Sequence, residues 1–372
     1  MLLIAWRNLV ADRIRLMVTL VGIAFAVMLM IFEGSLLVGF VAAASNIVDA
    51  TDADIWVTAR GVRAFDLPAP LPDRFRDVVR GVDGVESAGR LVAGFTSWSP
   101  PSGQNRTVLL VGADRNIGGR LPSPRVANAY AFESVVVDRS SAADLEAGNL
   151  PVEVEIGSPR RRAIVRHLAT GFGTFLGPPY VFTGYDDGVR YLGWSPQQTA
   201  FIAVRLRNSS RVASAKRDIA AKLPEVDVWS TREFAWRSSS YWLIQTGAGG
   251  ALLTAAVLGL MVGLVIVAQN MYAITLQHIE EFATLKALGA SNASIAAIVS
   301  LQALISGAIG TTIGIATAAP GVRYAAALIP WIVMPGWLVG LVAAVGIGMC
   351  LMACLIAIRP AMSSDPATVF RA

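Results

Sequence analysis

The sequence predicts an α-helical membrane protein with four transmembrane helices and an α+β extracytoplasmic domain between the first and second of them. Three observations lead to this fold class. The chain of 372 residues is 54 % hydrophobic and only 15 % charged, whereas soluble domains carry about 25 % charged residues. Four apolar runs are long enough to cross a hydrocarbon core, which takes about 20 helical residues. The charges gather in residues 43–240, which hold 24 of the 31 Lys and Arg and 21 of the 26 Asp and Glu.

The predicted segments alternate between membrane and water along the chain. Transmembrane helices are expected at residues 16–42, 247–274, 295–319 and 337–358. The remaining segments are a cytoplasmic amphipathic helix at 1–15, the extracytoplasmic domain at 43–240, a cytoplasmic helix and turn at 275–294, a short extracytoplasmic loop at 320–336 and a cytoplasmic tail at 359–372. Six Lys and Arg flank the spans on one side and only Arg323 on the other. By the positive-inside rule, both termini are therefore cytoplasmic.

The extracytoplasmic domain is predicted to mix strands and helices. Strand-like runs occupy 54–58, 107–112, 134–138, 152–156 and 199–206, and helices are expected at 72–80 and 211–222. Each helix precedes a short valine-rich strand, at 85–92 and 226–229. This repetition suggests two related lobes. Residues 163–190 are rich in glycine and aromatic residues and are predicted to form a long loop.

The sequence offers no catalytic or metal-binding constellation. The domain has no Gly-x-Ser-x-Gly motif, and its one histidine, His167, has no triad partners around it. Asp186 and Asp187 are interpreted as turn residues. The only two cysteines, Cys350 and Cys354, are four residues apart in an apolar run, so we expect neither a disulfide nor a zinc site. The net charge of the 43–240 stretch is only +3 (24 minus 21), which gives no indication of nucleic-acid binding.

Glu33 is the one acidic residue inside a predicted span. A carboxylate in the bilayer is costly and is by default a functional candidate. The alternative is that Glu33 faces a partner helix or reaches water near the outer end of its span, and this alternative is favoured because no other span supplies a partner for a proton relay. The glycine pairs 259/263, 310/314 and 336/340 would permit close helix approach.

The polar stretch between the second and third spans, HIEEFATLKALGASNASI at 278–295, is predicted to form a short helix up to Leu288. Gly289 is placed to end this helix in a left-handed cap. Ser291 can cap the start of the third span. Glu281 and Lys286 are five residues apart, so they do not form a standard helical pair.

Three regions resemble the ABC-transporter permeases of the MacB/FtsX type, and within them the DevC-like branch. They are AWRNLVADRIRLMVTLVGIAFAV at 5–27, VGLVIVAQNMYAITLQHIEEFATLKALGASNASI at 262–295 and RPAMSSDPATVFRA at 359–372. The chain departs from many relatives at His278 and Glu280, where arginines are common, and at Gln302 in the third span, where a glutamate is common. The family's glutamate is retained as Glu281.

The resemblance implies a permease of the bacterial inner membrane that holds no cofactor itself. A cytoplasmic ABC ATPase dimer would bind ATP and Mg²⁺, and the chain has no Gly-x-x-x-x-Gly-Lys-Ser/Thr loop of its own. A second copy of the permease and, in DevC-like systems, a periplasmic membrane-fusion adaptor and an outer-membrane channel are the other implied partners. Mechanotransmission would move a lipid, glycolipid or other hydrophobic cargo. The segment at 275–294 would be the coupling helix, with the ATPase contact made by Glu281, Phe282, Leu285, Lys286 and Gly289, and Glu33 and Gln302 would be the intramembrane polar residues.

Two other functions fit a similar topology. One is an FtsX-like regulator that activates an extracytoplasmic cell-wall hydrolase, and the other is a lipoprotein-extraction permease. The roughly 200 residues of the predicted outer domain favour export or extraction over regulation, because FtsX proteins have smaller outer domains. A membrane enzyme is the least favoured class because no catalytic set is found.

Overall fold

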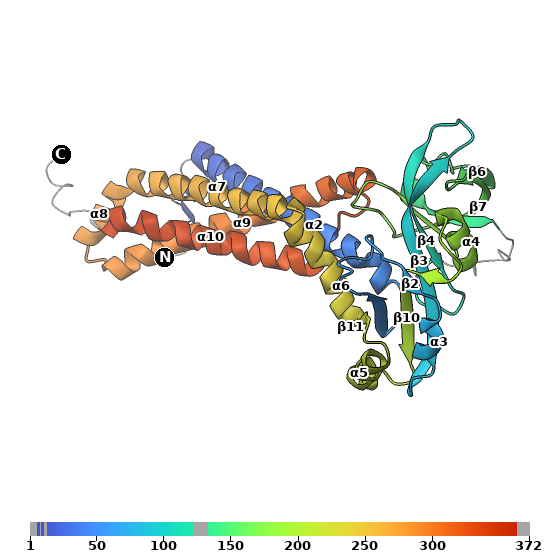
Figure 1. The fold of residues 1–372 in the computed structure, drawn as a ribbon. Helices are drawn as coiled ribbons and strands as arrows, with labels where there is room; N and C mark the ends of the chain where they lie inside the picture. The colour runs from blue at the N-terminus through green and yellow to red at the C-terminus, as the bar shows by residue number, and fades with distance from the viewer. Residues whose placement is uncertain (1–5, 8, 11–12, 123–132, 363–372) are drawn as a thin grey trace. The chain divides into compact units, whose positions relative to one another are not determined.

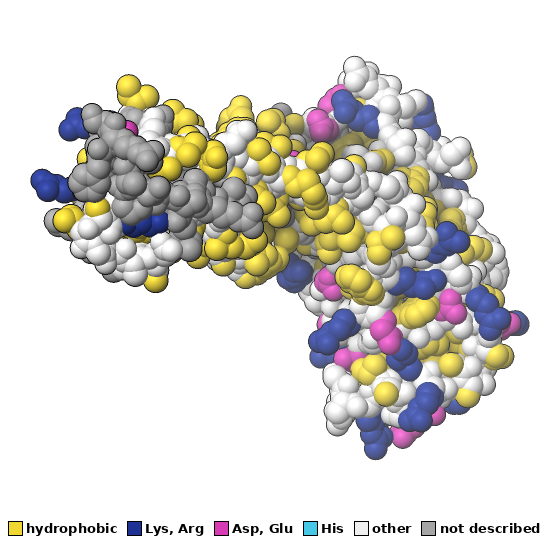
Figure 2. All heavy atoms as spheres, turned by 90° about the vertical axis from the view of Figure 1, so that its left-hand side faces the viewer, with side chains coloured by type: hydrophobic (Ala, Val, Ile, Leu, Met, Phe, Trp, Pro, Cys, Tyr) yellow, Lys and Arg dark blue, Asp and Glu magenta, His cyan; other side chains and the backbone are white. Residues whose placement is uncertain are grey.

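The computed structural model describes residues 6–7, 9–10, 13–122 and 133–362 (Figure 1). The chain divides into two compact units. The helical unit contains the described residues up to 38 together with 250–326 and 332–362, and the α/β unit contains residues 39–249 and 327–331. Charged side chains gather over the α/β unit, whereas the visible side chains of the helical unit are mainly hydrophobic (Figure 2).

Four helices of the described chain are long and apolar enough to cross a membrane. They are α2 (Arg13–Asp49), α7 (Ala248–Gln277), α9 (Asn292–Leu328) and α10 (Gly336–Met362). The predicted fold class, four such helices with an α/β unit inserted between the first and second, is confirmed. The predicted interfacial helix at 1–15 and the tail at 359–372 lie largely outside the described residues.

The predicted loop at 320–336 is wrong in its first half, because α9 continues through Pro320 to Leu328. Proline removes one backbone donor and usually ends or kinks a helix. Here the residues that follow it, up to Leu328, include three alanines, which are the strongest helix formers. The connection to α10 therefore shrinks to residues 329–335.

Glycines allow α2 to pack closely against other helices of the unit. A Cβ atom on Gly310 of α9 would lie 2.7 Å from Cβ of Ile23, and one on Gly314 would lie 2.7 Å from the carbonyl oxygen of Ala24. A Cβ on Gly263 of α7 would lie 2.6 Å from Cβ of Ala26. The 310/314 pair therefore serves close packing within the chain, whereas a Cβ on Gly336 or Gly340 would meet nothing within 4 Å.

The α/β unit is built on a nine-stranded sheet with the order β11-β1-β10-β3-β4-β8-β5-β7-β6. Strand β6 also pairs with β3, so six strands form a closed ring in the order β3, β4, β8, β5, β7 and β6. The strands are β1 (Ile55–Ala59), β3 (Val85–Ser99), β4 (Arg106–Ala113), β5 (Ser134–Asp138), β6 (Val152–Ile156), β7 (Arg161–Ala169), β8 (Tyr180–Gly184), β10 (Phe201–Leu206) and β11 (Val226–Ser230). The short strands β2 (Leu71–Pro72) and β9 (Gln198–Thr199) pair separately.

The open end of the sheet contains two interleaved strand–helix–strand motifs. The first is β1, α3 (Phe75–Arg80) and β3, and the second is β10, α5 (Val212–Lys222) and β11. The predicted repetition of a helix followed by a strand is confirmed. These two strand–helix–strand motifs do not form separate lobes, because β10 lies between β1 and β3 and pairs antiparallel with both. Their apolar residues consequently share one core, which includes Val57, Phe75 and Ile219.

The ring of six strands has a core of its own, in which Trp98, Leu110, Val137 and Val165 are buried. The long strand β3 joins the two parts, since its first half pairs with β10 and its second half pairs with β4. The open part of the sheet and the ring are therefore connected by one continuous strand, β3.

The predicted loop at 163–190 is wrong, because β7, β8 and the helix α4 (Tyr185–Leu192) occupy most of it. Of the glycines that suggested a loop, Gly171, Gly173 and Gly177 lie in the connection between β7 and β8, whereas Gly184 ends β8 and Gly188 lies in α4. Asp186 and Asp187 lie in the first turn of α4, where carboxylates interact favourably with the helix dipole.

Candidate functional site

The polar segment between α7 and α9 forms the helix α8 (Ile279–Ala287). Its end is a Schellman motif, in which the amide of Gly289 donates to the carbonyl of Lys286 and the amide of Ala290 donates to that of Leu285, both at 2.9 Å. Gly289 has a φ of +96°, so the predicted left-handed cap is confirmed. Ser291 also caps α9 as predicted, since its Oγ accepts a hydrogen bond from the amide of Ser294 at 3.2 Å.

One face of α8 is anchored within the helical unit. Phe282 is 0 % exposed and Ala283 is 2 % exposed, and the helix contacts α10. A fully buried ring cannot offer its surface to another protein. We therefore reassign Phe282 from a predicted ATPase contact to an anchor that holds α8 against the other helices.

The remaining predicted contact residues lie at or near the surface. Glu281 and Gly289 are exposed, while Leu285 and Lys286 are half-buried. Nδ1 of His278 lies 3.1 Å from Oε1 of Glu281, whose side chain is still 56 % exposed. His278, at the boundary between α7 and α8, thus orients the glutamate from the preceding turn.

Leu288 is a surface residue that the sequence reasoning missed. It follows the last residue of α8 and is 81 % exposed. The Schellman turn at Gly289 holds the backbone here, with the amide of Leu288 donating to the carbonyl of Thr284 at 3.1 Å. The signal in the sequence was a large apolar residue directly before the capping glycine, where the helix no longer covers it.

The acidic first turn and Leu288 give the exposed part of α8 its chemistry. Glu280 and Glu281 are both exposed, while Lys286 near the other end is half-buried. The surface thus combines an acidic end with one large apolar side chain. It can bind a partner that supplies cations and an apolar hollow.

Gln302 and Glu33 do not form a common polar site in the structure. Gln302 is 2 % exposed, and its Nε2 has no hydrogen-bond partner among the described residues. The hydroxyl of Ser306, one turn further along α9, is likewise buried without a partner in the described part of the chain. Glu33 on α2 is half-buried. The hydroxyl of Ser35 on α2 is also buried without a partner among the described residues. The structure shows no bond from Gln302 or Ser306 to Glu33.

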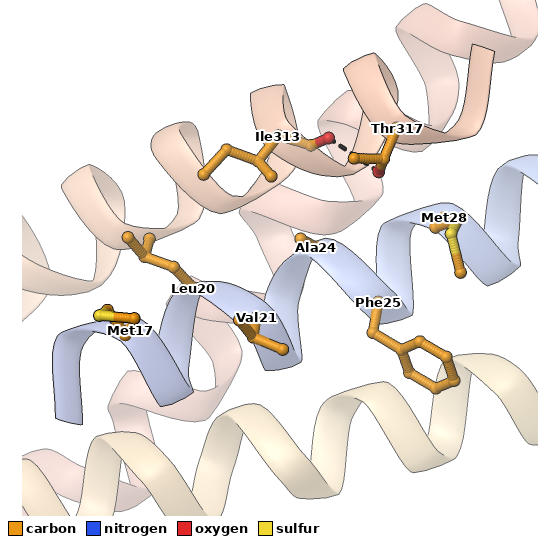
Figure 3. A pocket seen from close by; sticks show the side chains of 8 residues that line it. All are labelled: Met17, Leu20, Val21, Ala24, Phe25, Met28, Ile313 and Thr317. Carbon is orange, nitrogen blue, oxygen red and sulfur yellow. Dashed lines mark hydrogen bonds between the residues drawn. The ribbon is translucent and has the colours of Figure 1, made fainter. Parts of the chain in front are cut away.

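An apolar groove of about 420 Å³ runs between α2 and α9 (Figure 3). Its lining comes mainly from α2, with Ile313 and Thr317 supplied by α9. The hydroxyl of Thr317 donates to the carbonyl of Ile313 at 2.9 Å, which satisfies the one side-chain donor in the lining. The groove consequently offers only apolar contacts, of the kind that a hydrocarbon chain makes.

No group of three or more His, Cys, Asp or Glu side chains is placed to hold a metal ion in the described ranges 6–7, 9–10, 13–122 and 133–362. Outside the helical unit, Asp66 is a buried carboxyl group that lies far along the chain from α8. Burial raises the pKa of Asp66 to about 6.

Comparison with known proteins identifies the region that contains α8. The family described as FtsX-like permease C-terminal matches residues 253–366, which run from α7 through α8 and α9 to α10. No curated protein sequence matches the chain.

Several solved structures are similar to part of the chain, each at 12 % sequence identity. The periplasmic region of MacB from Actinobacillus actinomycetemcomitans is matched over 50 % of this chain and 91 % of that chain, with a TM-score of 0.37. The extracellular domain of the noncanonic ABC-type transporter YknZ from Gram-positive bacteria is matched over 48 % and 98 %, with a TM-score of 0.32. A domain of a permease protein from Porphyromonas gingivalis is matched over 49 % and 89 %, with a TM-score of 0.28. At these TM-scores the likeness carries no argument about function.

The sequence match places the family's C-terminal region on three of the four apolar helices and on the polar helix between two of them. The predicted MacB/FtsX type is thereby confirmed, whereas the DevC-like branch stays a prediction. Residues 253–366 of the chain are thus similar to the C-terminal region of the FtsX-like permeases.

Proposed function

We propose that the chain is the membrane subunit of an ATP-driven ABC exporter, and that ATP and Mg²⁺ bind in a separate ATPase subunit. The observation that carries this proposal is the FtsX-like permease match over residues 253–366, since α8 lies inside it. The sequence has no phosphate-binding loop of the Gly-x-x-x-x-Gly-Lys-Ser/Thr type, which agrees with ATP binding in a separate subunit.

The contact with that partner is α8. Phe282 and Ala283 tie this helix to the other helices of the unit, so a displacement of α8 is passed on to them. The hydrogen bonds of the Schellman motif at Gly289 hold the backbone of the short turn between α8 and α9, so a movement of α8 is passed on to α9. The exposed Glu281 and Leu288 then face an ATPase groove that supplies basic side chains around an apolar hollow.

The cargo is a lipid, a glycolipid or another hydrophobic molecule, handled by mechanotransmission. The apolar groove between α2 and α9 supports this class, because its lining is apolar apart from Thr317, whose hydroxyl is bonded to the carbonyl of Ile313. The working assembly contains a second copy of the permease, a cytoplasmic ATPase dimer and, if the chain is of the DevC-like branch, a periplasmic adaptor and an outer-membrane channel. It resides in the bacterial inner membrane with both termini in the cytoplasm.

The proposal is tested by co-purification of the full-length chain with the ABC ATPase encoded beside it. In nanodiscs we expect a stable complex in wild type, and an at least tenfold weaker complex when Glu281 and Leu285 are both changed to alanine. Asp83→Ala is the matched control, because the Asp83 side chain is 92 % exposed in the α/β unit and away from α8 in the chain. If the double variant binds the ATPase and supports its activity as wild type does, α8 is not the contact.

The reading frames beside the gene separate export from regulation. An adaptor of the membrane-fusion type next to an ATPase supports the exporter. A peptidoglycan hydrolase in that position would instead support an FtsX-like regulator, and the export proposal would be abandoned.

A further inference from the structure

The connection between β7 and β8, residues 170–179, is fixed to the ring of strands at its base. The amide of Phe172 donates to Oδ2 of Asp138, the last residue of β5, at 2.9 Å. The Phe172 ring packs edge-to-face on Phe182 of β8, with the centroids 4.9 Å apart. Both partners of the hydrogen bond are buried. A movement of this connection, which we call the β7–β8 loop, is therefore passed on to β5 and β8.

The middle of the β7–β8 loop carries an aromatic ring, Phe175, that contacts two other segments. Its centroid is 4.9 Å from that of Phe40 on α2 and 5.5 Å from that of Trp242, both edge to face. Trp242 belongs to η3, a short π-helix (Tyr241–Gln245) that is separated from α7 by two residues. Aromatic pairs in this geometry attract each other beyond the effect of burial. Phe175 thus links the loop to α2 and to the segment that leads into α7.

The same loop lies against the connection between α9 and α10, residues 329–335. A Cβ atom on Gly173 would lie 2.7 Å from Cβ of Pro330 and 3.2 Å from its carbonyl oxygen. The next residue, Trp331, packs edge-to-face on Phe40, with the centroids 6.1 Å apart. Because the proline ring also fixes its own backbone angle, the two segments meet here without spare room.

A hydrogen bond adds a second contact with α2. Nδ2 of Asn46 donates to the carbonyl of Gly171 at 2.7 Å. All the residues of these contacts, from Phe40 to Trp331, lie within the α/β unit. The β7–β8 loop therefore touches a segment that belongs to, or leads into, each of the four long helices.

Along the chain, the long helices enter the sheet at its open edge. Helix α2 leads into β1, and β11 leads through α6 (Thr231–Ser240) and η3 into α7. Strands β11 and β1 come first in the order of the sheet, whereas the ring begins at β3. A movement that followed the backbone would consequently cross β1 and β10 before it reached the ring. The contacts of the β7–β8 loop are a direct route to the ring.

We propose that the β7–β8 loop transmits movements of α2, of η3 and of the α9–α10 connection to the ring of six strands, with Gly173 and Phe175 as its coupling residues. Closely packed contacts have low compressibility, so a shift of one partner is passed on to the other. Coupling between distant sites is carried by chains of packed side chains and hydrogen bonds. The loop has both, from Trp331 through Phe40 and Phe175, and from Phe172 to Asp138.

The coupling can be measured without an ATPase, by hydrogen–deuterium exchange of the full-length chain in nanodiscs of phosphatidylcholine. Trp331→Ala perturbs the α9–α10 connection, and the readout is the exchange of β5 in the ring. We expect this exchange to rise by about fivefold or more, because coupled positions respond to each other through local opening. In the Phe175→Ala background the same change should add less than about twofold, since the link to Phe40 is already lost.

Two further variants make the test specific. Phe95→Ala removes a ring that is 48 % exposed on β3 of the same unit, and the response to Trp331→Ala should remain. Gly173→Ala keeps every ring but forces the loop away from Pro330, so it should also abolish the response, and it decides the question if Phe175→Ala does not fold. Additive effects of Trp331→Ala and Phe175→Ala, or a β5 that does not respond to Trp331→Ala, would overturn the proposal.

That ATP drives these movements rests on the proposed function and is tested separately, with the ATPase encoded beside the gene and a non-hydrolysable ATP analogue with Mg²⁺. In wild type we expect the nucleotide to change the exchange of both α8 and β5. Phe175→Ala should keep the change in α8 and reduce that in β5 by about fivefold. An undiminished change in β5 would refute the role of the loop. If α8 itself does not respond in wild type, the proposed function fails, and the experiment without ATPase still decides the role of the loop.

Discussion

Replacing Phe282 and Leu288 separately should divide the role of α8 into anchoring and partner contact. Phe282→Ala removes a ring that is 0 % exposed, whereas Leu288→Ala removes a side chain that is 81 % exposed. Truncating a buried phenylalanine costs about 3–5 kcal/mol, because both burial and a packed cavity wall are lost. A change at an exposed position away from special features is usually within about 0.5 kcal/mol.

The magnitudes predict opposite outcomes in two assays on the full-length chain. At about 2–4 °C per kcal/mol, Phe282→Ala should lower the apparent Tm by roughly 6 °C or more, whereas Leu288→Ala should leave it unchanged. If Leu288 is buried by the ATPase, its loss removes about 1.5–3 kcal/mol of binding, which corresponds to a roughly 10- to 100-fold increase in Kd. Thermal unfolding and titration with the purified ATPase measure the two effects.

Phe282→Leu is the matched control for the anchor, because it keeps an apolar side chain in place and should recover most of the Tm. If Phe282→Ala left the Tm unchanged and abolished ATPase binding, the ring would be a contact residue after all. If Leu288→Ala bound the ATPase with unaltered Kd, the assignment of the contact surface would be refuted.

Three further predictions concern the two units separately. Arg90→Ala should destabilise the α/β unit by about 2–4 kcal/mol, because it leaves Asp114, now bonded at 2.9 and 3.0 Å, as an unpaired and mostly buried carboxylate. Arg160→Ala removes an ion pair in which both side chains are exposed and should cost less than about 1 kcal/mol. Equal melting curves for the two variants would contradict this ranking. The stability of the α/β unit should fall as the pH rises from about 4 to about 6 and then level off, since the raised pKa of Asp66 makes the folded state bind the proton more tightly than the unfolded state does. The free energy of unfolding should fall by about 3 kcal/mol in total. In urea unfolding at several pH values, Asp66→Asn should remove this pH dependence. Gly314→Leu should prevent close packing of α9 on α2, because even a Cβ would lie 2.7 Å from a backbone carbonyl; we expect a cost of at least about 1–3 kcal/mol, measured as lower thermal stability in detergent, and a variant as stable as wild type would show that this contact does not form.

Local sequence signals were sufficient where one short-range effect decides the structure. The strands at 134–138 and 152–156 agree residue for residue with β5 and β6, because their valine-rich runs have strong strand propensity. The caps at Gly289 and Ser291 were likewise predictable, because each depends on the backbone or hydroxyl of a single residue type. The loop predicted at 163–190 failed because β8 pairs with β4, some 70 residues earlier in the chain, and that partner is invisible to a local reading.

The roles within α8 could be predicted only in part. The sequence indicated the polar helix and its cap, and the family resemblance supplied the contact residues. It did not show that Phe282 turns inward or that Leu288 stands outward, since both are apolar and six residues apart on one short segment. The pairing of Glu281 with His278 was also missed, although a spacing of three residues permits it.

By itself, the sequence determined the four apolar helices and the position of the inserted α/β unit, because the length and hydropathy of a segment suffice to make it a membrane span. Only the tertiary structure decided that β6 pairs with β3, that Gly310 and Gly314 pack against α2, and that Asp66 bonds Tyr180. These contacts join residues between about 60 and 290 positions apart, and their energy comes from close packing and from the exclusion of water. Close packing and the exclusion of water arise only when the chain folds, so a local reading of the sequence does not show these contacts.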